Sequence, residues 1–261
     1  MKKVVLFLSI MAGMTACKKD NAPADKPAPK NTYLKSEVID VFNGTTTYTL
    51  SSTYTYDSQN RVSGIVETST NTSISPNRSS TNFVYNSKGK LESFQGQYIS
   101  GGTTYAYKYT YIYTDAGIVQ EMTTTNLATN IITQRNTYEY TNNGLIYRFV
   151  QPSGTVSQTS IFTFNKDNVA QIEYKNQSGT TVSIQNYAGY DTKPNPLQMK
   201  WASIPDKLRS VNNCTTETRT ITSTGVATTA QYSYEYNADG YPTKRTDNAS
   251  GRTAIWTYEK R

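Results

Sequence analysis

The chain contains no histidine among its 261 residues, and its only cysteines are Cys17 and Cys214. Without histidine there is no Ser-His-Asp triad, no Cys-His dyad, no His-ligated zinc and no histidine pH switch. Asn213 and Thr215, which flank Cys214, supply no positive charge that would activate its thiol. We expect Cys214 to be a small apolar strand residue, and we predict no catalytic residue, no cofactor and no metal site.

Long hydrophobic runs are also absent, except for a short one at the start. Residues 4–11 are apolar and follow two lysines, but they are too few to span a bilayer. Met14-Thr15-Ala16-Cys17 then has the pattern of a lipobox, in which small residues precede the cysteine that receives a diacylglycerol. We predict a lipoprotein signal peptide over residues 1–16 and a mature protein held to a lipid bilayer through acylated Cys17.

Positive charge is modest once this leader is removed. Removal of its two lysines leaves 24 basic residues against 19 acidic ones, a formal charge of +5. The basic residues are scattered, so we expect no nucleic-acid partner. Residues 17–31 contain three prolines and read as the lipidated cysteine and a flexible tether. We expect an outer-membrane lipoprotein, facing either the periplasm or the cell surface.

Tyrosine is abundant, with 22 residues, while histidine, cysteine and tryptophan are scarce. Tyrosine and threonine favour strands, where each can present one face to water. The segment from Tyr105 to Tyr113 carries tyrosine at every second position, so its tyrosines should share one face of a sheet. The composition therefore predicts an all-β protein.

A motif recurs along residues 32–261: a strand that ends in an aromatic residue, three turn residues, glycine or asparagine, any residue, and usually an aliphatic one. The six clear instances run from Tyr56 to Val62, Tyr85 to Leu91, Tyr113 to Val119, Tyr140 to Ile146, Phe164 to Ala170 and Tyr236 to Pro242. Glycine adopts the left-handed conformation freely, and asparagine is the next most tolerant residue. Each instance therefore predicts a tight β-hairpin with a bulge. We predict positive φ at Asn60, Gly89, Gly117, Gly144, Asn168 and Gly240.

These hairpins predict one domain, an antiparallel meander of about 12 strands that curls into a barrel or half-barrel. The first strand is expected near Tyr33 to Val41 and the last near Ala254 to Glu259. If the barrel closes, these two strands should pair, because closure removes both sheet edges. A non-repeat insertion near residues 193–213 interrupts the pattern, and Leu197 to Ala202 within it could form one or two helical turns.

The units resemble YD repeats, the Tyr-Asp hairpin repeats of RHS-type bacterial surface proteins. This likeness is clearest in Tyr54-Thr-Tyr56-Asp57-Ser-Gln-Asn60-Arg61-Val62 and Tyr234-Glu-Tyr236-Asn-Ala-Asp-Gly240. Nearly the whole chain is more specifically similar to a family of uncharacterised Bacteroidota lipoproteins with a porin-like β-meander. Residues 190–197, followed by Asn212-Asn213, also resemble that family. The resemblance implies a barrel or half-barrel and brings no catalytic residue.

Three functions remain open from the sequence. The first is a non-enzymatic envelope module that binds a glycan or an envelope protein, with Trp201, Tyr107, Tyr109 and Tyr111 as candidate ligand contacts, since tyrosine rings offer flat apolar faces with a hydroxyl. The second is a purely structural envelope or assembly module, in which the tyrosines are cross-strand packing pairs. The third is a carbohydrate-active enzyme with two carboxylates, although nothing in the spacing pairs them.

A membrane-spanning barrel is a further reading of the same pattern. Such a barrel needs a continuous apolar outer band. Here threonine, serine, lysine and glutamine alternate with tyrosine. We therefore expect a soluble barrel on a lipid anchor.

Overall fold

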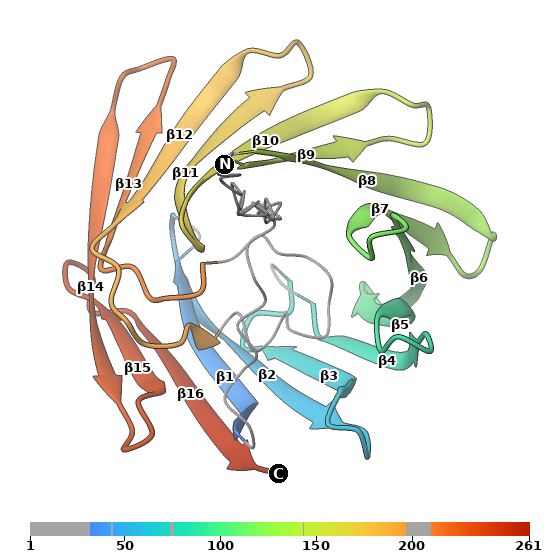
Figure 1. The fold of residues 1–261 in the computed structure, drawn as a ribbon, viewed down its shortest axis with the longest axis horizontal. Helices are drawn as coiled ribbons and strands as arrows, with labels where there is room; N and C mark the ends of the chain where they lie inside the picture. Colours follow the sequence, from blue (N-terminus) through green and yellow to red (C-terminus); the bar gives the residue numbers. More distant parts are fainter. Residues whose placement is uncertain (1–31, 43, 74–75, 143, 197–209) are drawn as a thin grey trace, which may run out of the picture.

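The protein is a barrel closed by sixteen antiparallel strands (Figure 1). The structure, a computed structural model, describes residues 32–42, 44–73, 76–142, 144–196 and 210–261. The strands are β1 (Thr32–Phe42), β2 (Thr47–Tyr56), β3 (Val62–Ser69), β4 (Arg78–Tyr85), β5 (Leu91–Ser100), β6 (Thr103–Tyr113), β7 (Val119–Asn126), β8 (Ile131–Thr141), β9 (Gly144–Val150), β10 (Val156–Asn165), β11 (Asn168–Asn176), β12 (Thr181–Ala188), β13 (Thr216–Ile221), β14 (Ala227–Tyr236), β15 (Pro242–Asp247) and β16 (Thr253–Lys260). No helix within these ranges is long and apolar enough to cross a bilayer.

Every strand pairs with its neighbours in the sequence, and the first strand pairs with the last. In this closing pair, Leu34 of β1 lies opposite Tyr258 of β16, and Ile39 lies opposite Ala254. The prediction that the first and last strands pair is therefore confirmed. Because the barrel is closed, no sheet edge is left to recruit another chain.

The number of strands is sixteen and not about twelve. The six recognisable turns account for twelve strands, which are the hairpins from β2–β3 to β10–β11 and the hairpin β14–β15. The other four strands have no glycine or asparagine turn to mark them. β12 and β13 flank the insertion, and β16 and β1 form a hairpin whose turn is replaced by the two chain ends.

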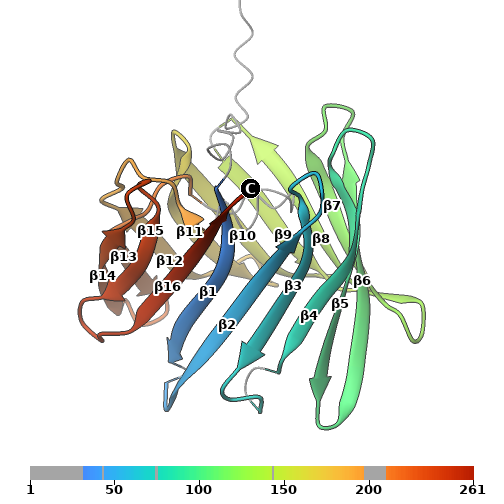
Figure 2. The same cartoon turned by 90° about the horizontal axis from the view of Figure 1, so that it is seen from below.

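The barrel has two different ends (Figure 2). The six tight turns lie at one end, together with Thr32 at the start of β1 and the C-terminus, since Thr32 pairs with Lys260. We call this the turn end. The opposite end, called the loop end, carries the return connections, which are residues 43–46, 70–77, 101–102, 127–130, 151–155, 177–180, 222–226 and 248–252.

Four of the six predicted turns have the expected left-handed residue. The φ angles are 61° at Asn60, 73° at Gly89, 75° at Gly117 and 84° at Gly240. In all four of these turns the side chain of the first turn residue accepts a backbone N–H group. Asp57 Oδ1, for example, accepts from Gln59 and Arg61 at 2.9 Å each. Side-chain acceptors of this kind stabilise a tight turn.

The prediction was wrong at Gly144 and Asn168, which are the first residues of β9 and β11. Thr141 pairs with Gly144 and Asn165 pairs with Asn168, so only two residues connect the strands. In the second loop the left-handed residue is Lys166, with φ of 57°. The motif alone does not distinguish a two-residue loop from a longer one with a bulge, because both favour glycine and asparagine.

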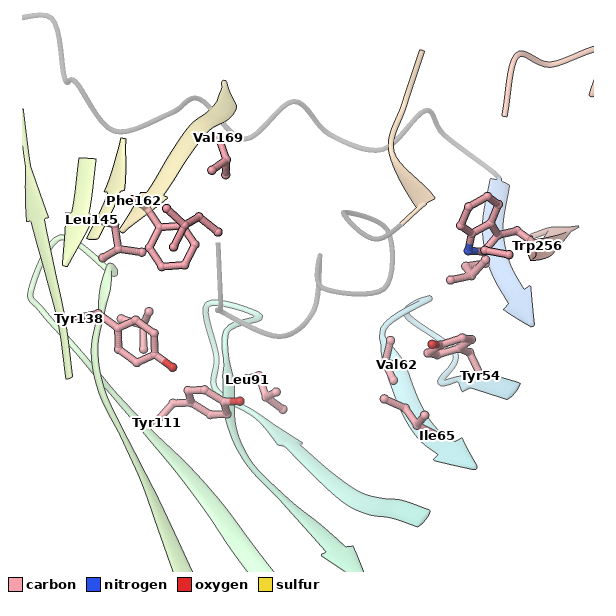
Figure 3. Close-up of a cluster of buried hydrophobic side chains, with 14 of the residues drawn as sticks. Tyr54, Val62, Ile65, Leu91, Tyr111, Tyr138, Leu145, Phe162, Val169 and Trp256 are labelled. Atoms are coloured by element: carbon pink, nitrogen blue, oxygen red, sulfur yellow. The ribbon is translucent and has the colours of Figure 1, made fainter. Parts of the chain in front are cut away.

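A ring of six aliphatic side chains forms the core at the turn end. They are Leu34, Val62, Leu91, Val119, Leu145 and Val169, each 0–3% exposed. Each is at or near the start of a strand. Figure 3 shows four of them, Val62, Leu91, Leu145 and Val169, pointing into the barrel. Leu145 and Val169 occupy the position that the motif assigned to Ile146 and Ala170. The shorter loops shift the register by one residue, which exchanges the two faces of a strand.

Tyrosine hydroxyls tie consecutive hairpins together at this end. Tyr56, at the end of β2, donates a 2.6 Å hydrogen bond to the carbonyl oxygen of Leu34. The same bond recurs from Tyr85 to Val62, Tyr113 to Leu91, Tyr190 to Val169 and Tyr258 to Pro242, at 2.5–2.6 Å. A repeated side-chain-to-backbone bond of this kind satisfies a carbonyl at the rim and joins each unit to the previous one.

The base of the insertion is held at the turn end by an amide and carboxylate network. Asp191 Oδ1 accepts the backbone N–H groups of Lys193 and Asn213, at 2.9 and 3.1 Å. Asn213, 3% exposed, also donates from Nδ2 to Asp191 Oδ2 at 3.0 Å. Asn195 Nδ2 donates to the carbonyl of Ser210 at 3.0 Å. The residues that carry the family resemblance at 190–196 and 212–213 thus join the two sides of the insertion.

Several predicted features lie outside the described residues. They are the signal peptide over 1–16, Cys17 and the tether over 17–31, and the segment 197–209 with Trp201 and the expected helical turns.

Candidate functional site

Aromatic rings cover the inner wall of the barrel along β5 and β6. Phe94 stacks between Phe83 and Tyr109, with ring centroids 5.1 and 4.5 Å apart and planes within 12°. Nearer the loop end, Tyr98 stacks on Tyr105 at 5.0 Å and on Tyr107 at 6.1 Å. These side chains share one face because the strands alternate, and the face is the one that points into the barrel.

A glycine lets one of these rings lie flat against the wall. Gly96 of β5 pairs with Tyr107, diagonal to Tyr109 of β6. A Cβ atom on Gly96 would lie only 2.9 Å from Cε2 of Tyr109. The Tyr109 ring therefore covers the glycine backbone. Strand glycines commonly mark such a close approach.

Four of these rings, Phe94, Tyr98, Tyr107 and Tyr109, line a cavity of about 520 Å³ together with Gly96. Its lining also includes Ile65, Glu67, Arg78, Ser79, Ser80, Gln97, Tyr111, Met122, Asn136, Tyr138 and Tyr147. Along β6 the exposed fraction rises from 7% at Tyr111 to 37% at Tyr105. The cavity is thus closed towards the turn end and accessible from the loop end. Its volume and mixed lining are typical of small-molecule sites.

Two opposite charges lie side by side in this lining. Glu67 of β3 is directly opposite Arg78 of β4. The Arg78 guanidinium lies 6.0 Å from the centre of the Tyr98 ring, within cation–π range. Arg78 makes no ion pair with a carboxylate of the described residues. Its donors are therefore available to a bound molecule.

Two tyrosines of the cavity, Tyr107 and Tyr109, are held in the neutral form. A hydrogen bond with Tyr98, together with burial, raises the pKa of Tyr107. Burial also raises the pKa of Tyr109, although Arg78 acts in the opposite direction. Neutral phenols can donate as well as accept hydrogen bonds. The wall therefore combines apolar ring faces with hydroxyl donors.

Comparisons with known proteins give structural matches but no sequence family. No protein-family model matches the chain, and no curated protein matches it. A porin-like protein from Bacteroides uniformis is similar at 18% identity and a TM-score of 0.44, over 87% of this chain and 98% of that one. A porin-like protein from Bacteroides vulgatus is similar at 12% identity and a TM-score of 0.44, over 88% and 99%.

The structure brings together three of the predicted contact residues. Tyr107, Tyr109 and Tyr111 all line the cavity, with Tyr111 almost completely buried at its closed side. Trp201 and Cys17 are outside the described residues.

Sequence reasoning missed Tyr98, Arg78 and Glu67, which line the same cavity. The spacing Phe94-Gln-Gly96-Gln-Tyr98 has the two-residue period of an inner wall and was a usable signal. Nothing in the sequence indicates that Arg78 and Glu67 face each other. Within the described ranges, no three histidine, cysteine, aspartate or glutamate side chains converge to hold a metal ion.

Proposed function

We propose that this protein is a non-enzymatic, lipid-anchored module of the cell envelope that binds a sugar ligand inside its barrel. The observation that carries the proposal is the cavity closed at the turn end, with Tyr98, Tyr107 and Tyr109 on its wall. Flat aromatic faces stack on the apolar faces of sugar rings, and Arg78 and the tyrosine hydroxyls offer hydrogen bonds to sugar hydroxyls. A few fixed polar groups on an apolar wall are sufficient to orient such a ligand.

The carboxylates of the inner wall support binding without catalysis. Glu37 and Glu67 lie on either side of Ser52, on strands β1 and β3. Glu37 is 2% exposed, and it accepts a 3.0 Å hydrogen bond from Trp256 Nε1. It does not line the cavity that Glu67 lines. A glycosidase needs both carboxyl groups to face the same glycosidic bond.

The outer wall supports a barrel that lies outside the lipid phase. Ion pairs lie on the outward face in the middle of strands, such as Arg135 with Glu121 at 3.1 Å and Arg148 with Glu139 at 2.9 Å. The outer face of a membrane-spanning barrel carries an apolar band, and charged residues there are costly. A lipid anchor at Cys17 would then be the connection to the outer membrane.

The position of Thr32 places the point where the tether would join the barrel. Fourteen residues separate Cys17 from Thr32, and fully extended they would reach about 50 Å. Since Thr32 lies at the turn end, the tether would join the barrel there and leave the loop end unobstructed.

The repeat architecture supports a relationship to YD-type hairpin repeats. In three of the six recognised units the leading tyrosine donates to a carbonyl of the previous unit, as Tyr85 does to Val62. This bond gives the tyrosine of the repeat a physical role that does not depend on a ligand. We propose that the units belong to that repeat class.

A saccharide-binding assay with a matched pair of variants tests the proposed function. Tyr98→Ala removes a ring from the cavity wall, whereas Lys108→Ala changes an exposed residue on β6 that does not line the cavity. We expect calorimetry against a panel of plant and bacterial oligosaccharides to find at least one ligand. Tyr98→Ala should lower the affinity for that ligand about tenfold or more, which corresponds to about 1.4 kcal/mol of binding free energy. A panel without any ligand, or equal affinity for both variants, would contradict the proposal.

The anchor is tested separately. Cys17→Ser should abolish incorporation of labelled palmitate and move the protein from the membrane fraction to the soluble fraction. Unchanged membrane association of this variant would exclude Cys17 as the anchor.

A structural role is the second candidate, and the tyrosine–carbonyl bonds favour it. They occur at five hairpin junctions and give five of the 22 tyrosines a role that needs no ligand. If deletion of the protein impairs envelope integrity and Tyr98→Ala restores it as well as the unaltered protein does, the structural role is the better description.

A further inference from the structure

The inner wall carries a second cavity beside the first. It has a volume of about 500 Å³ and is lined by Ser157, Gln158, Tyr174, Lys175, Asn176, Val182, Ser183, Gln185 and Arg219. These residues come from the four consecutive strands β10 to β13. The first cavity is rich in aromatic rings, whereas this one is rich in amides and hydroxyls.

Strand register places the two cavities next to each other. Gln158 of the second cavity lies opposite Phe149 of β9, and Phe149 lies opposite Asn136 of the first cavity. Adjacent strands are about 4.8 Å apart, so the Cα atoms of Gln158 and Asn136 are separated by about 10 Å. This distance is about the width of two strands, and only the half-buried Phe149 side chain lies between.

A second row of residues makes the same connection closer to the turn end. Tyr147 of the first cavity lies opposite Ser160, and Ser160 lies opposite Tyr174 of the second cavity. Ser160 is small and 3% exposed, so its side chain does not form a barrier between the two tyrosine rings. The wall is therefore continuous from one cavity to the other.

Each cavity contains one arginine that has no carboxylate partner among the described residues. Arg78 is in the first cavity and Arg219 is in the second, and both are exposed. An arginine side chain offers five N–H donors in a fixed plane. Glu67 faces Arg78 across β3 and β4, and Glu217 precedes Arg219 by two residues on the same strand, so neither arginine creates a strong positive field.

The loop end, through which a ligand reaches both cavities, is almost free of charge. Among all residues of its eight connections, Arg252 alone is charged, and it pairs with Asp247 at 3.1 Å. Threonine, serine, glycine, asparagine and glutamine make up most of the rest. Such a rim offers hydrogen bonds without long-range electrostatic attraction, which suits an uncharged polar ligand. It has no cluster of basic residues that would bind a polyanion.

We infer that the two cavities are consecutive subsites of one groove, and that the ligand is an uncharged oligosaccharide long enough to occupy both. This inference rests on the proposed function, because it specifies the length and charge of the sugar ligand. The first subsite stacks sugar rings on Tyr98 and Tyr109. The second holds the continuing chain through hydrogen bonds from Arg219 and the neighbouring amides, with Phe149 between them.

The test is a chain-length series with the full-length protein extracted in detergent. The probes are malto-, cello-, xylo- and manno-oligosaccharides from disaccharides to octasaccharides, titrated by calorimetry. In at least one series we expect affinity to rise about tenfold or more between the disaccharide and the hexasaccharide, and then to level off. Uronate oligosaccharides of the same lengths should bind no more tightly than the neutral ones.

Variants separate the two subsites. Arg219→Ala should weaken the long oligosaccharides about tenfold while leaving the disaccharide unchanged, and Tyr98→Ala should weaken every length. Because Arg219 is exposed, its substitution should leave the melting temperature unchanged, which excludes misfolding as the cause. Lys108→Ala, outside both cavities, should change neither affinity.

Different results overturn the inference and the proposed function. If short and long oligosaccharides bind equally, or if Arg219→Ala has no effect on the longest one, the shared groove is wrong while sugar binding stands. Tighter binding of the uronate series would overturn the inference that the ligand is uncharged. If no oligosaccharide of any length binds, the proposed function fails and this inference fails with it.

Discussion

Leu34 near the start of β1 lies opposite Tyr258 near the end of β16, although the two residues are at opposite ends of the chain. The same pairing of an aromatic with an aliphatic residue joins Tyr56 to Val62 and Tyr85 to Leu91 within single hairpins. The closing pair is therefore one more hairpin of the series, made without a turn. The barrel is a ring of eight hairpins, one of which is made by the first and the last strand.

The closing hairpin should be sensitive to loss of Trp256. This side chain is 4% exposed, and its Nε1 donates to Glu37 Oε1 across the β1–β16 pair. Trp256→Phe removes a buried donor to a carboxylate and part of the ring volume. We expect a loss of about 2–4 kcal/mol in the free energy of unfolding, measured by urea denaturation. Ile255→Ala, on the exposed outer face of the same strand, should cost much less, and equal losses for the two would contradict this role.

The tyrosine hydroxyls at the turn end should contribute to stability one by one. Tyr56→Phe removes the 2.6 Å bond to the carbonyl of Leu34 and keeps the ring. The expected cost is about 1–2 kcal/mol, since a rim carbonyl loses its donor. Tyr105→Phe, whose ring is 37% exposed, serves as the control and should stay within about 0.5 kcal/mol. A Tyr56→Phe protein as stable as the unaltered one would show that the bond contributes nothing to the free energy of unfolding.

Asp247 should make stability depend on pH at the loop end. The Ser250 hydroxyl holds the pKa of this carboxyl below its usual value, helped by the Ala249 N–H and by Arg252, while burial acts in the opposite direction. A pKa that is lower in the folded state stabilises the protein above the unfolded value of about 4, and this stabilisation is lost as the pH falls through the folded value.

Asp247→Asn should therefore be less stable than the unaltered protein at neutral pH, with the difference shrinking at acid pH. Urea midpoints at pH 7 and pH 3 measure the effect. Asp115→Asn, in the turn between β6 and β7, is the control for a general charge effect. A difference that stays constant across this pH range would refute the assignment to the carboxylate.

The thiol of Cys214 should react slowly with alkylating reagents in the folded protein. Burial, and then the negative charge of Glu217, raises the pKa of this thiol to about 11. At pH 8 the thiolate fraction is then about a hundredfold smaller than for an ordinary cysteine. Iodoacetamide labelling should be slow until urea unfolds the protein. Ser153→Cys, placed in an exposed connection of the loop end in a Cys214→Ser background, should react at the ordinary rate, and an equally fast Cys214 would contradict the burial.

Local rules in the sequence were enough to predict the elements of the barrel. The alternation from Tyr105 to Tyr113 predicts a strand with one aromatic face, and that face points inward at Tyr111. Asn60 and Gly89 predict left-handed turn residues, which the φ angles confirm. These features depend on steric limits within a few residues, so the sequence carries them completely.

The same rules failed where the local sequence allows two different loop lengths. The turns at Gly144 and Asn168 are one residue shorter than the motif predicts, because both loop lengths accept glycine and asparagine. The choice depends on which residue must face the interior, and Leu145 and Val169 fill the apolar ring there. Burial of a core position, which is a property of the whole sheet, selects the loop.

The amino-acid sequence by itself determined the all-β class and the hairpin period, because turns and side-chain alternation are local. The tertiary structure alone decided that sixteen strands close the ring, that Arg78 faces Glu67, and that two cavities adjoin across Phe149. Those relationships depend on the pairing register of every strand in the closed sheet. A shift of one residue in any strand would exchange the inner and outer faces and remove the cavity wall.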